Sequence, residues 1–159
     1  MKIKLIVVGK IKDSFLEAGT NEYIKRIKPY CNIEILEVKD ERMSDRPNEA
    51  EISKAKNEEG ERILKQIKPS DFVINLDLNK KEFDSESFAM YLDKTFEKAN
   101  SQITFVIGGS YGLSDDVKNR GNDAISLSKL TFLHTMTRLI LLEQIYRSFK
   151  INNNETYHK

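Results

Sequence analysis

Residues 103–112 read ITFVIGGSYG, and this stretch decides the class of the fold. Its first five residues are apolar or β-branched with almost no polar alternation, which is typical of a strand buried on both faces of a parallel sheet. Three of the next five residues are glycines, and the pattern of a short helix begins just beyond them at Ser114. A buried strand that passes through a glycine turn into a helix is the building unit of an α/β protein.

The same alternation of strand and helix extends over the rest of the chain. Four more strands are expected, at residues 1–8, 33–38, 72–78 and 124–127, and helices are expected to begin near residues 14, 48, 85, 115 and 135. Ser14 and Glu17 have the spacing of a capping box at the first helix. We therefore predict an α/β fold with a five-stranded, mainly parallel sheet and helices on both faces. No linker or repeat divides the chain, so residues 1–159 are predicted to form a single domain.

Composition narrows the class of protein further. The chain has 159 residues, of which 39% are hydrophobic and 32% charged, which excludes a disordered or collagen-like chain. A single cysteine, Cys31, excludes an internal disulfide, and two histidines are too few for a His-rich metal site, which leaves only Asp and Glu residues as candidate metal ligands. No apolar run approaches the roughly 20 residues that span a bilayer, so we expect no membrane partner and a cytoplasmic location.

The net charge of +1 conceals an uneven distribution. Residues 1–30 and residues 118–159 each carry seven basic and three acidic side chains, whereas residues 31–117 carry twelve basic and nineteen acidic ones. If the fold brings the two ends together, they would form a positive face able to meet an anionic partner. An ordinary solvated mixture of surface charges explains the same numbers.

Ligands of an open parallel sheet bind beyond the carboxyl ends of its strands, where the glycine-rich residues 108–112 are expected. These glycines lack the GxGxxG spacing of a dinucleotide site and the GxxxxGK[ST] spacing of a phosphate loop. Ser110 also lacks the GxSxG context of a nucleophile. The loop is therefore either a cradle that holds a small ligand through main-chain groups or a tight turn.

The C-terminal tail holds two residues that no core explains, Tyr157 and His158. Either the tail docks on a surface, or it is a frayed terminus. Arg147 lies four residues after Glu143 on the expected last helix, so a surface ion pair explains it locally. A functional role for Arg147 depends on the tail folding back.

Several separate motifs resemble, in order, those of one bacterial family. They are residues 8–10 (VGK), 105–109 (FVIGG) with Gly112-Leu113, 127–132 (LSKLTF) with His134 and Arg138, 143–147 (EQIYR), and Tyr157-His158. With these motifs the chain resembles the large-subunit ribosomal RNA pseudouridine N3-methyltransferases of the SPOUT superfamily, over essentially its whole length. One position departs from the family pattern, because Leu133 stands where the family usually has proline.

The resemblance implies a knot, an assembly and a cofactor. The C-terminal part would form a trefoil knot, and two copies of the chain would form a homodimer with a shared active site. The cofactor would be S-adenosyl-L-methionine, and no metal would be needed. The family's cofactor contacts fall on Leu76, Gly108, Leu127, Ser128, Lys129, Leu130, Thr131 and Phe132. These positions follow the third, fourth and fifth expected strands, where the sheet rule also places a ligand.

The implied reaction transfers a methyl group to N3 of pseudouridine 1915 in helix 69 of 23S rRNA, with the ribosome as partner. N3 is nucleophilic only after it loses its proton, so the site must assist deprotonation or stabilise the anion. As a hypothesis, His158 or Tyr157 handles the proton or positions the base, and Arg147 binds the uracil oxygens or a phosphate.

Two other classes of protein fit the same pattern of strands and helices. One is a flavodoxin-like or other nucleotide-binding regulatory module without catalysis. The other is a ribosome-binding protein without enzymatic activity, which the basic ends favour but which gives no reason for a cofactor loop.

Overall fold

The structure, a computed structural model, describes residues 1–159 and contains five strands and five helices in strict alternation, as the sequence predicts. The strands are β1 (Lys2–Val8), β2 (Asn32–Val38), β3 (Phe72–Lys81), β4 (Gln102–Ile107) and β5 (Asp123–Ile125). The helices are α1 (Ser14–Ile27), α2 (Glu49–Leu64), α3 (Ser85–Lys98), α4 (Asp115–Arg120) and α5 (His134–Asn152).

The five strands form one sheet in the order β2-β1-β4-β3-β5, and every pair is parallel. The α/β class and the parallel sheet are therefore confirmed. The order differs from the flavodoxin-like order 2-1-3-4-5, because β4 lies between β1 and β3. The flavodoxin-like alternative is therefore wrong for this sheet.

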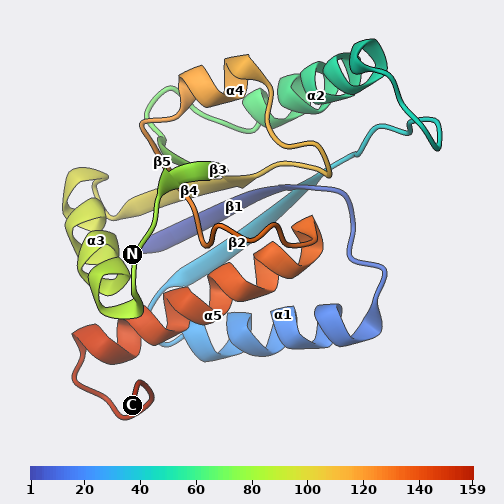
Figure 1. The fold of residues 1–159 in the computed structure, drawn as a ribbon. Helices are drawn as coiled ribbons and strands as arrows, with labels where there is room; N and C mark the ends of the chain where they lie inside the picture. The colour runs from blue at the N-terminus through green and yellow to red at the C-terminus, as the bar shows by residue number, and fades with distance from the viewer.

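Helices cover both faces of the sheet, as Figure 1 shows. In β1, Ile3, Leu5 and Val7 belong to the core under α1, α3 and α5, whereas Ile6 and Val8 belong to the core under α2 and α4. This alternation follows from the two-residue period of a strand, which sends successive side chains to opposite faces. A strand buried on both faces accordingly reads as an unbroken apolar run.

Three local predictions need correction. Asp13, not Ser14, occupies the N-cap of α1 and makes no side-chain cap bond, so the capping box is absent. β3 continues past its expected end to Lys81, which pairs with Ile125, and β5 ends at Ile125. The backbone N–H of Ser126 then donates to the Lys81 carbonyl at 2.9 Å. These contacts join segments far apart in the sequence, so periodicity along one strand does not reveal them.

Leu133 precedes α5 with a backbone φ of −54°. This value lies in the range to which a proline ring is fixed, so the leucine enters the helix with the conformation that proline would have. Its carbonyl accepts a hydrogen bond from the Thr137 backbone N–H at 2.9 Å. The departure from the family pattern at this position therefore leaves the turn into α5 intact.

The fold also brings the two ends of the chain together, because α5 packs beside α1 (Figure 1). The rings of Tyr30, which follows α1, and Phe149 on α5 stack with centroids 5.4 Å apart. The basic side chains on these helices are mostly paired: Arg26 contacts Glu22 and Arg147 contacts Glu143. The two basic segments are therefore adjacent, and these two arginines are engaged by glutamates of their own helices.

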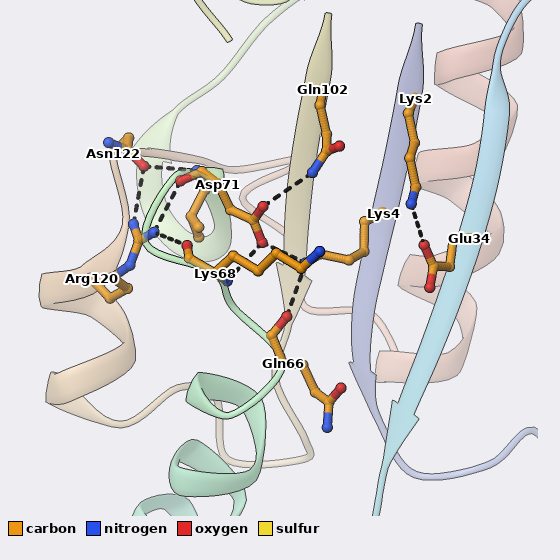
Figure 2. Close-up of polar contacts among 10 residues, drawn as sticks. Lys2, Lys4, Glu34, Gln66, Lys68, Asp71, Gln102, Arg120 and Asn122 are labelled. Atoms are coloured by element: carbon orange, nitrogen blue, oxygen red, sulfur yellow. Dashed lines mark hydrogen bonds and ion pairs between the residues drawn. The ribbon is translucent and has the colours of Figure 1, made fainter. Parts of the chain in front are cut away.

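A buried ion pair lies between β1 and the start of β3, away from the carboxyl ends of the strands (Figure 2). The Lys4 ammonium lies 2.5 Å from Asp71 Oδ2 and also donates to the Gln66 carbonyl at 2.9 Å. Asp71 accepts two more hydrogen bonds, from the Lys68 backbone N–H and from the Gln102 side chain. This pair ties β1, β3 and β4 to the loop after α2.

Candidate active site

A cavity of about 570 Å³ lies at the carboxyl ends of β3 and β4. Three segments form its wall: the end of β3, the glycine loop at residues 108–113, and residues 127–134 between β5 and α5. Ligands of parallel sheets bind at this edge because loops from several strands converge there. We refer to this space as the cofactor cavity.

Seven of the eight predicted cofactor contacts line the cofactor cavity: Leu76, Gly108, Leu127, Ser128, Leu130, Thr131 and Phe132. Lys129 is the exception, because it is exposed and is not part of the wall. The structure therefore brings together residues from three segments, the most distant of which, Leu76 and Phe132, are 56 positions apart in the sequence.

The glycine loop is shaped by a close approach of its own backbone. A Cβ atom on Gly108 would lie 2.8 Å from the carbonyl carbon and oxygen of Gly112, which is too close for any side chain. A hydrogen bond of 3.0 Å from the Gly112 N–H to the Gly109 carbonyl closes the turn. The loop is both a tight turn and part of the cavity wall, so the two interpretations of the sequence are compatible.

Hydrogen bonds to residues 77–81 of β3 fix the start of the segment that follows β5. Ser126 Oγ accepts from the Lys80 backbone N–H at 2.9 Å and donates to the Asp77 carbonyl. Residues 127–134 then run along the cavity to the start of α5. The knot expected from the resemblance concerns this part of the chain and stays a prediction.

The C-terminal tail is docked, not frayed. The Tyr157 hydroxyl donates to Glu143 at 3.0 Å and lies 3.2 Å from the Tyr23 hydroxyl. The Arg147 guanidinium donates twice to the same Glu143 oxygen, at 2.6 and 3.1 Å, and lies 4.7 Å from the centre of the Tyr157 ring. The expected Glu143–Arg147 pair is thus present, and it also holds the tail on α5.

His158 completes this group, which we call the tail cluster (Glu143, Arg147, Tyr157 and His158). Its Nδ1 lies 3.2 Å from Arg147 Nη1. Arginine is always a donor, so Nδ1 accepts this bond and the neutral ring carries its proton on Nε2. Burial and hydrogen bonds with Tyr23 and Glu143 raise the pKa of Tyr157 far above its ordinary value. Arg147, the Tyr157 hydroxyl and the Nε2–H of this His158 tautomer are therefore hydrogen-bond donors.

A second cavity, of about 610 Å³, lies beside His158 and the start of α3. Leu127 and Phe132 line both this tail cavity and the cofactor cavity. Of the three predicted catalytic residues, only His158 lines the tail cavity, whereas Arg147 and Tyr157 hold it in place. The predicted site residues thus fall into two groups, one around each cavity, and the two cavities share Leu127 and Phe132 in their linings.

With this geometry established, comparison with known proteins is informative. A family model described as "Predicted SPOUT methyltransferase" matches residues 1–158. The chain belongs to the SPOUT methyltransferase family. It is 48% identical to a protein of Exiguobacterium sp. strain AT1b and 46% identical to one of Enterococcus faecalis, in both cases over 159 residues and the full length of each chain. Both relatives are named "Ribosomal RNA large subunit methyltransferase H".

Solved structures show the same SPOUT fold at much lower identity. A probable methylase family protein from Haemophilus influenzae Rd KW20 is 12% identical with a TM-score of 0.57, over 99% of this chain and 70% of that one. The putative methyltransferase Lpg2936 from Legionella pneumophila, described in complex with bound SAM, is 11% identical with a TM-score of 0.51, over 91% and 65% of the two chains. None of the helices of the SPOUT methyltransferase described here has the length and hydropathy needed to cross a bilayer.

The wall of the cofactor cavity fits S-adenosylmethionine, the methyl donor of SPOUT methyltransferases. Gly108 brings bare backbone to the cavity, and apolar side chains from residues 127–133 line it, as a site for an adenosine group requires. Asp77 and Lys118 also line it, with 3.5 Å between their charged groups, and so offer partners of both signs to a zwitterionic amino-acid group.

Sequence reasoning missed several residues of this SPOUT methyltransferase. Tyr23 of α1 contacts Tyr157 of the C-terminal tail. Glu86 and Gln144 line the tail cavity, and Glu59 lies behind the glycine loop. No local pattern marks these residues, because each acquires its position from a neighbour distant in the sequence.

Proposed function

We propose that this protein methylates N3 of a pseudouridine in helix 69 of 23S rRNA, position 1915, with S-adenosyl-L-methionine as the methyl donor. The family membership and the names of the relatives support a ribosomal RNA substrate and a cytoplasmic place of action. The observation that carries the proposal is that the cofactor cavity adjoins a cavity lined by His158, with Leu127 and Phe132 in the linings of both.

In this proposal the cofactor supplies an electrophilic methyl group on a sulfonium sulfur. Residues Leu76 and Gly108 and the stretch 127–132 hold it, with Lys129 contributing main-chain atoms only, since its side chain is outside the wall. The tail cavity receives the target base beside Phe83, Phe88 and Phe132, whose rings suit stacking on a base drawn out of an RNA loop.

The tail cluster would act as a stabiliser of negative charge. The His158 Nε2–H is a donor that can bind one of the two carbonyl oxygens flanking N3, and Arg147 and Tyr157 hold His158 in place. A donor at this oxygen favours the deprotonated base, and N3 then loses its proton to solvent before it attacks the methyl group. This narrows the earlier hypothesis, because neither His158 nor Tyr157 has the free acceptor that a general base needs in this arrangement.

The proposal includes a homodimer in which the tail of one subunit completes the site of the other. Leu130 and Leu133, at the mouth of the cofactor cavity, are 70% and 57% exposed, and a second copy would cover these apolar side chains. A single small domain also has limited surface with which to recognise RNA, so the ribosome would supply much of the recognition.

The test is methyl transfer to ribosomes isolated from cells that lack this protein, with mass analysis of the helix-69 loop. We expect one added methyl group on the pseudouridine with wild-type protein. His158→Ala and Arg147→Ala should each lower turnover by about 100-fold or more while the cofactor affinity changes less than about twofold. Unchanged turnover in both variants would remove the tail cluster from the mechanism.

Arg26→Ala is the matched control for Arg147→Ala. Arg26 also pairs with a glutamate four residues earlier and also lies over a tyrosine ring, but it does not contact His158. It should therefore leave turnover within about twofold of wild type. Mixing His158→Ala with Gly108→Ala subunits should recover activity if the site is shared between subunits, and no recovery argues against a shared site.

A further inference from the structure

A buried carboxylate without a cationic partner lies directly behind the glycine loop. Glu59 on α2 is only 7% exposed, and its single hydrogen bond is a long one, 3.4 Å, from the Glu41 backbone N–H. It takes part in no ion pair, because the nearby Arg62 is engaged by Glu41 and Glu58. A buried charge left uncompensated in this way is costly, so it calls for an explanation.

The position of Glu59 relative to the cofactor cavity offers an explanation for this buried carboxylate. A Cβ atom on Gly109 would lie 2.9 Å from Oε1 and 3.0 Å from Oε2 of Glu59, so the carboxylate touches the back of that residue. Gly109 itself lines the cofactor cavity, whereas Glu59 does not. One layer of backbone therefore separates the carboxylate from the ligand space, and the absence of a side chain on Gly109 is what permits this approach.

We propose that the Glu59 carboxylate is the counter-charge for the sulfonium of S-adenosylmethionine, and that it makes the cavity discriminate between this cofactor and its product. The inference rests on the cofactor assignment of the proposed function. When the methyl group leaves, the sulfur keeps the electron pair of the broken bond and becomes a neutral thioether. S-adenosylhomocysteine therefore has the same adenosine and amino-acid groups but lacks the charge that Glu59 would stabilise. Attraction through a low-dielectric layer that excludes water acts on the cofactor alone.

The electrostatic surroundings of Glu59 agree with this role. Burial raises the pKa of Glu59, the Glu41 N–H lowers it, and the charges of Asp40 and Glu41 raise it again, against a smaller opposite effect of Arg62. Val8 of β1, which is uncharged, lies at the same place, because a Cβ atom on Gly109 would be 3.2 Å from its Cγ1. A bound cation would lower this raised pKa, so cofactor binding at mildly acidic pH should release a proton.

The experiment compares the affinities of S-adenosylmethionine and S-adenosylhomocysteine by calorimetry. Glu59→Gln should weaken binding of the cofactor by about tenfold and change binding of the product by less than about twofold. Glu58→Gln is the matched control, since it removes the same charge from the adjacent position of α2, where the carboxylate faces Arg62 and Lys54. It should change neither affinity.

Each other outcome is decisive. An equal loss for both ligands in Glu59→Gln would show that Glu59 only supports the loop, and no loss for either would exclude any role in the cavity. If Glu59→Gln does not fold, wild-type protein carries the test: titrations near pH 5 in two buffers of different ionisation enthalpy should show proton release with the cofactor and none with the product. A wild-type protein that binds neither ligand would instead refute the cofactor assignment itself.

Discussion

Neutralising Asp71 should destabilise the protein strongly without harming the site. Asp71→Asn keeps the shape of the side chain and an acceptor for the Lys68 N–H, but it leaves the Lys4 ammonium buried with the Gln66 carbonyl and no counter-charge. The side chains of Lys4 and Asp71 are only 6% and 1% exposed, so water cannot replace the lost partner. Breaking one side of such a pair costs about 3–5 kcal/mol.

That cost is a large part of the roughly 5–15 kcal/mol that stabilises a domain of this size, and it corresponds to a fall in melting temperature of about 10 °C. Urea unfolding at pH 7 measures it directly. Lys4→Met should cost a similar amount because it leaves the carboxylate unpaired. The double variant should lie within about 2 kcal/mol of wild type, since neither charge is then buried alone.

The reasoning would be refuted if the double variant lost as much stability as the two single variants together, or if Asp71→Asn cost less than about 1 kcal/mol. A pH titration gives an independent check. Burial by itself would raise the pKa of Asp71, but the bonds from Lys4 and the Lys68 N–H prevail and lower it. The pair therefore stabilises the protein above the unfolded pKa of about 3.9, and this contribution is lost as the pH falls through the lower folded pKa. Cofactor affinity of each folded variant should stay at the wild-type value.

Three further predictions concern other parts of the chain. Gly108→Ala should lower cofactor affinity at least about tenfold in calorimetry, because its Cβ would collide with backbone inside the loop, with only a modest change in melting temperature. Burial, and then the charge of Arg138, lower the pKa of His134, so wild type should lose stability to urea as the pH falls below about 6.5, and His134→Asn should lose less. Asn48→Ala should cost about 1 kcal/mol because Asn48 caps α2, whereas Ser14→Ala should cost less than about 0.5 kcal/mol because Ser14 caps nothing; equal costs would contradict both cap assignments.

Most of the fold could be predicted from local signals. The apolar run at 103–107 and the glycines after it are features of neighbouring residues, so strand β4 and its loop follow from the sequence. The position of β4 between β1 and β3 does not follow from the sequence, because the residues of a strand do not indicate which strands lie next to it in the sheet. The extension of β3 to Lys81 depends on Ser126 in the same way.

In the candidate site, too, local signals could be predicted and contacts between distant residues could not. Gly108 and residues 127–132 follow strands and could be expected at the ligand edge. All four members of the tail cluster could be named from the sequence, but the contact of Tyr157 with Tyr23 could not, because Tyr23 is 134 positions away. The burial of Glu59 could not be predicted from the sequence. Helix α2 is so rich in charged residues that each of its acidic residues suggests a solvent-exposed surface.

The placement of β4 beside β1 has a consequence for how the chain acquires its structure during synthesis. β1 and β2 can pair once residue 38 has emerged from the ribosome, but the other edge of β1 has no partner until residue 107 has emerged. At a typical rate of about 5–20 residues per second, that strand edge stays uncovered for roughly 3–14 seconds. The apolar face of α1 stays uncovered for longer, because its partner α5 is the last helix of the chain to be synthesised. During that interval the nascent residues 1–38 expose an unpaired strand edge and an uncovered apolar helix face, which are the features through which chains associate wrongly.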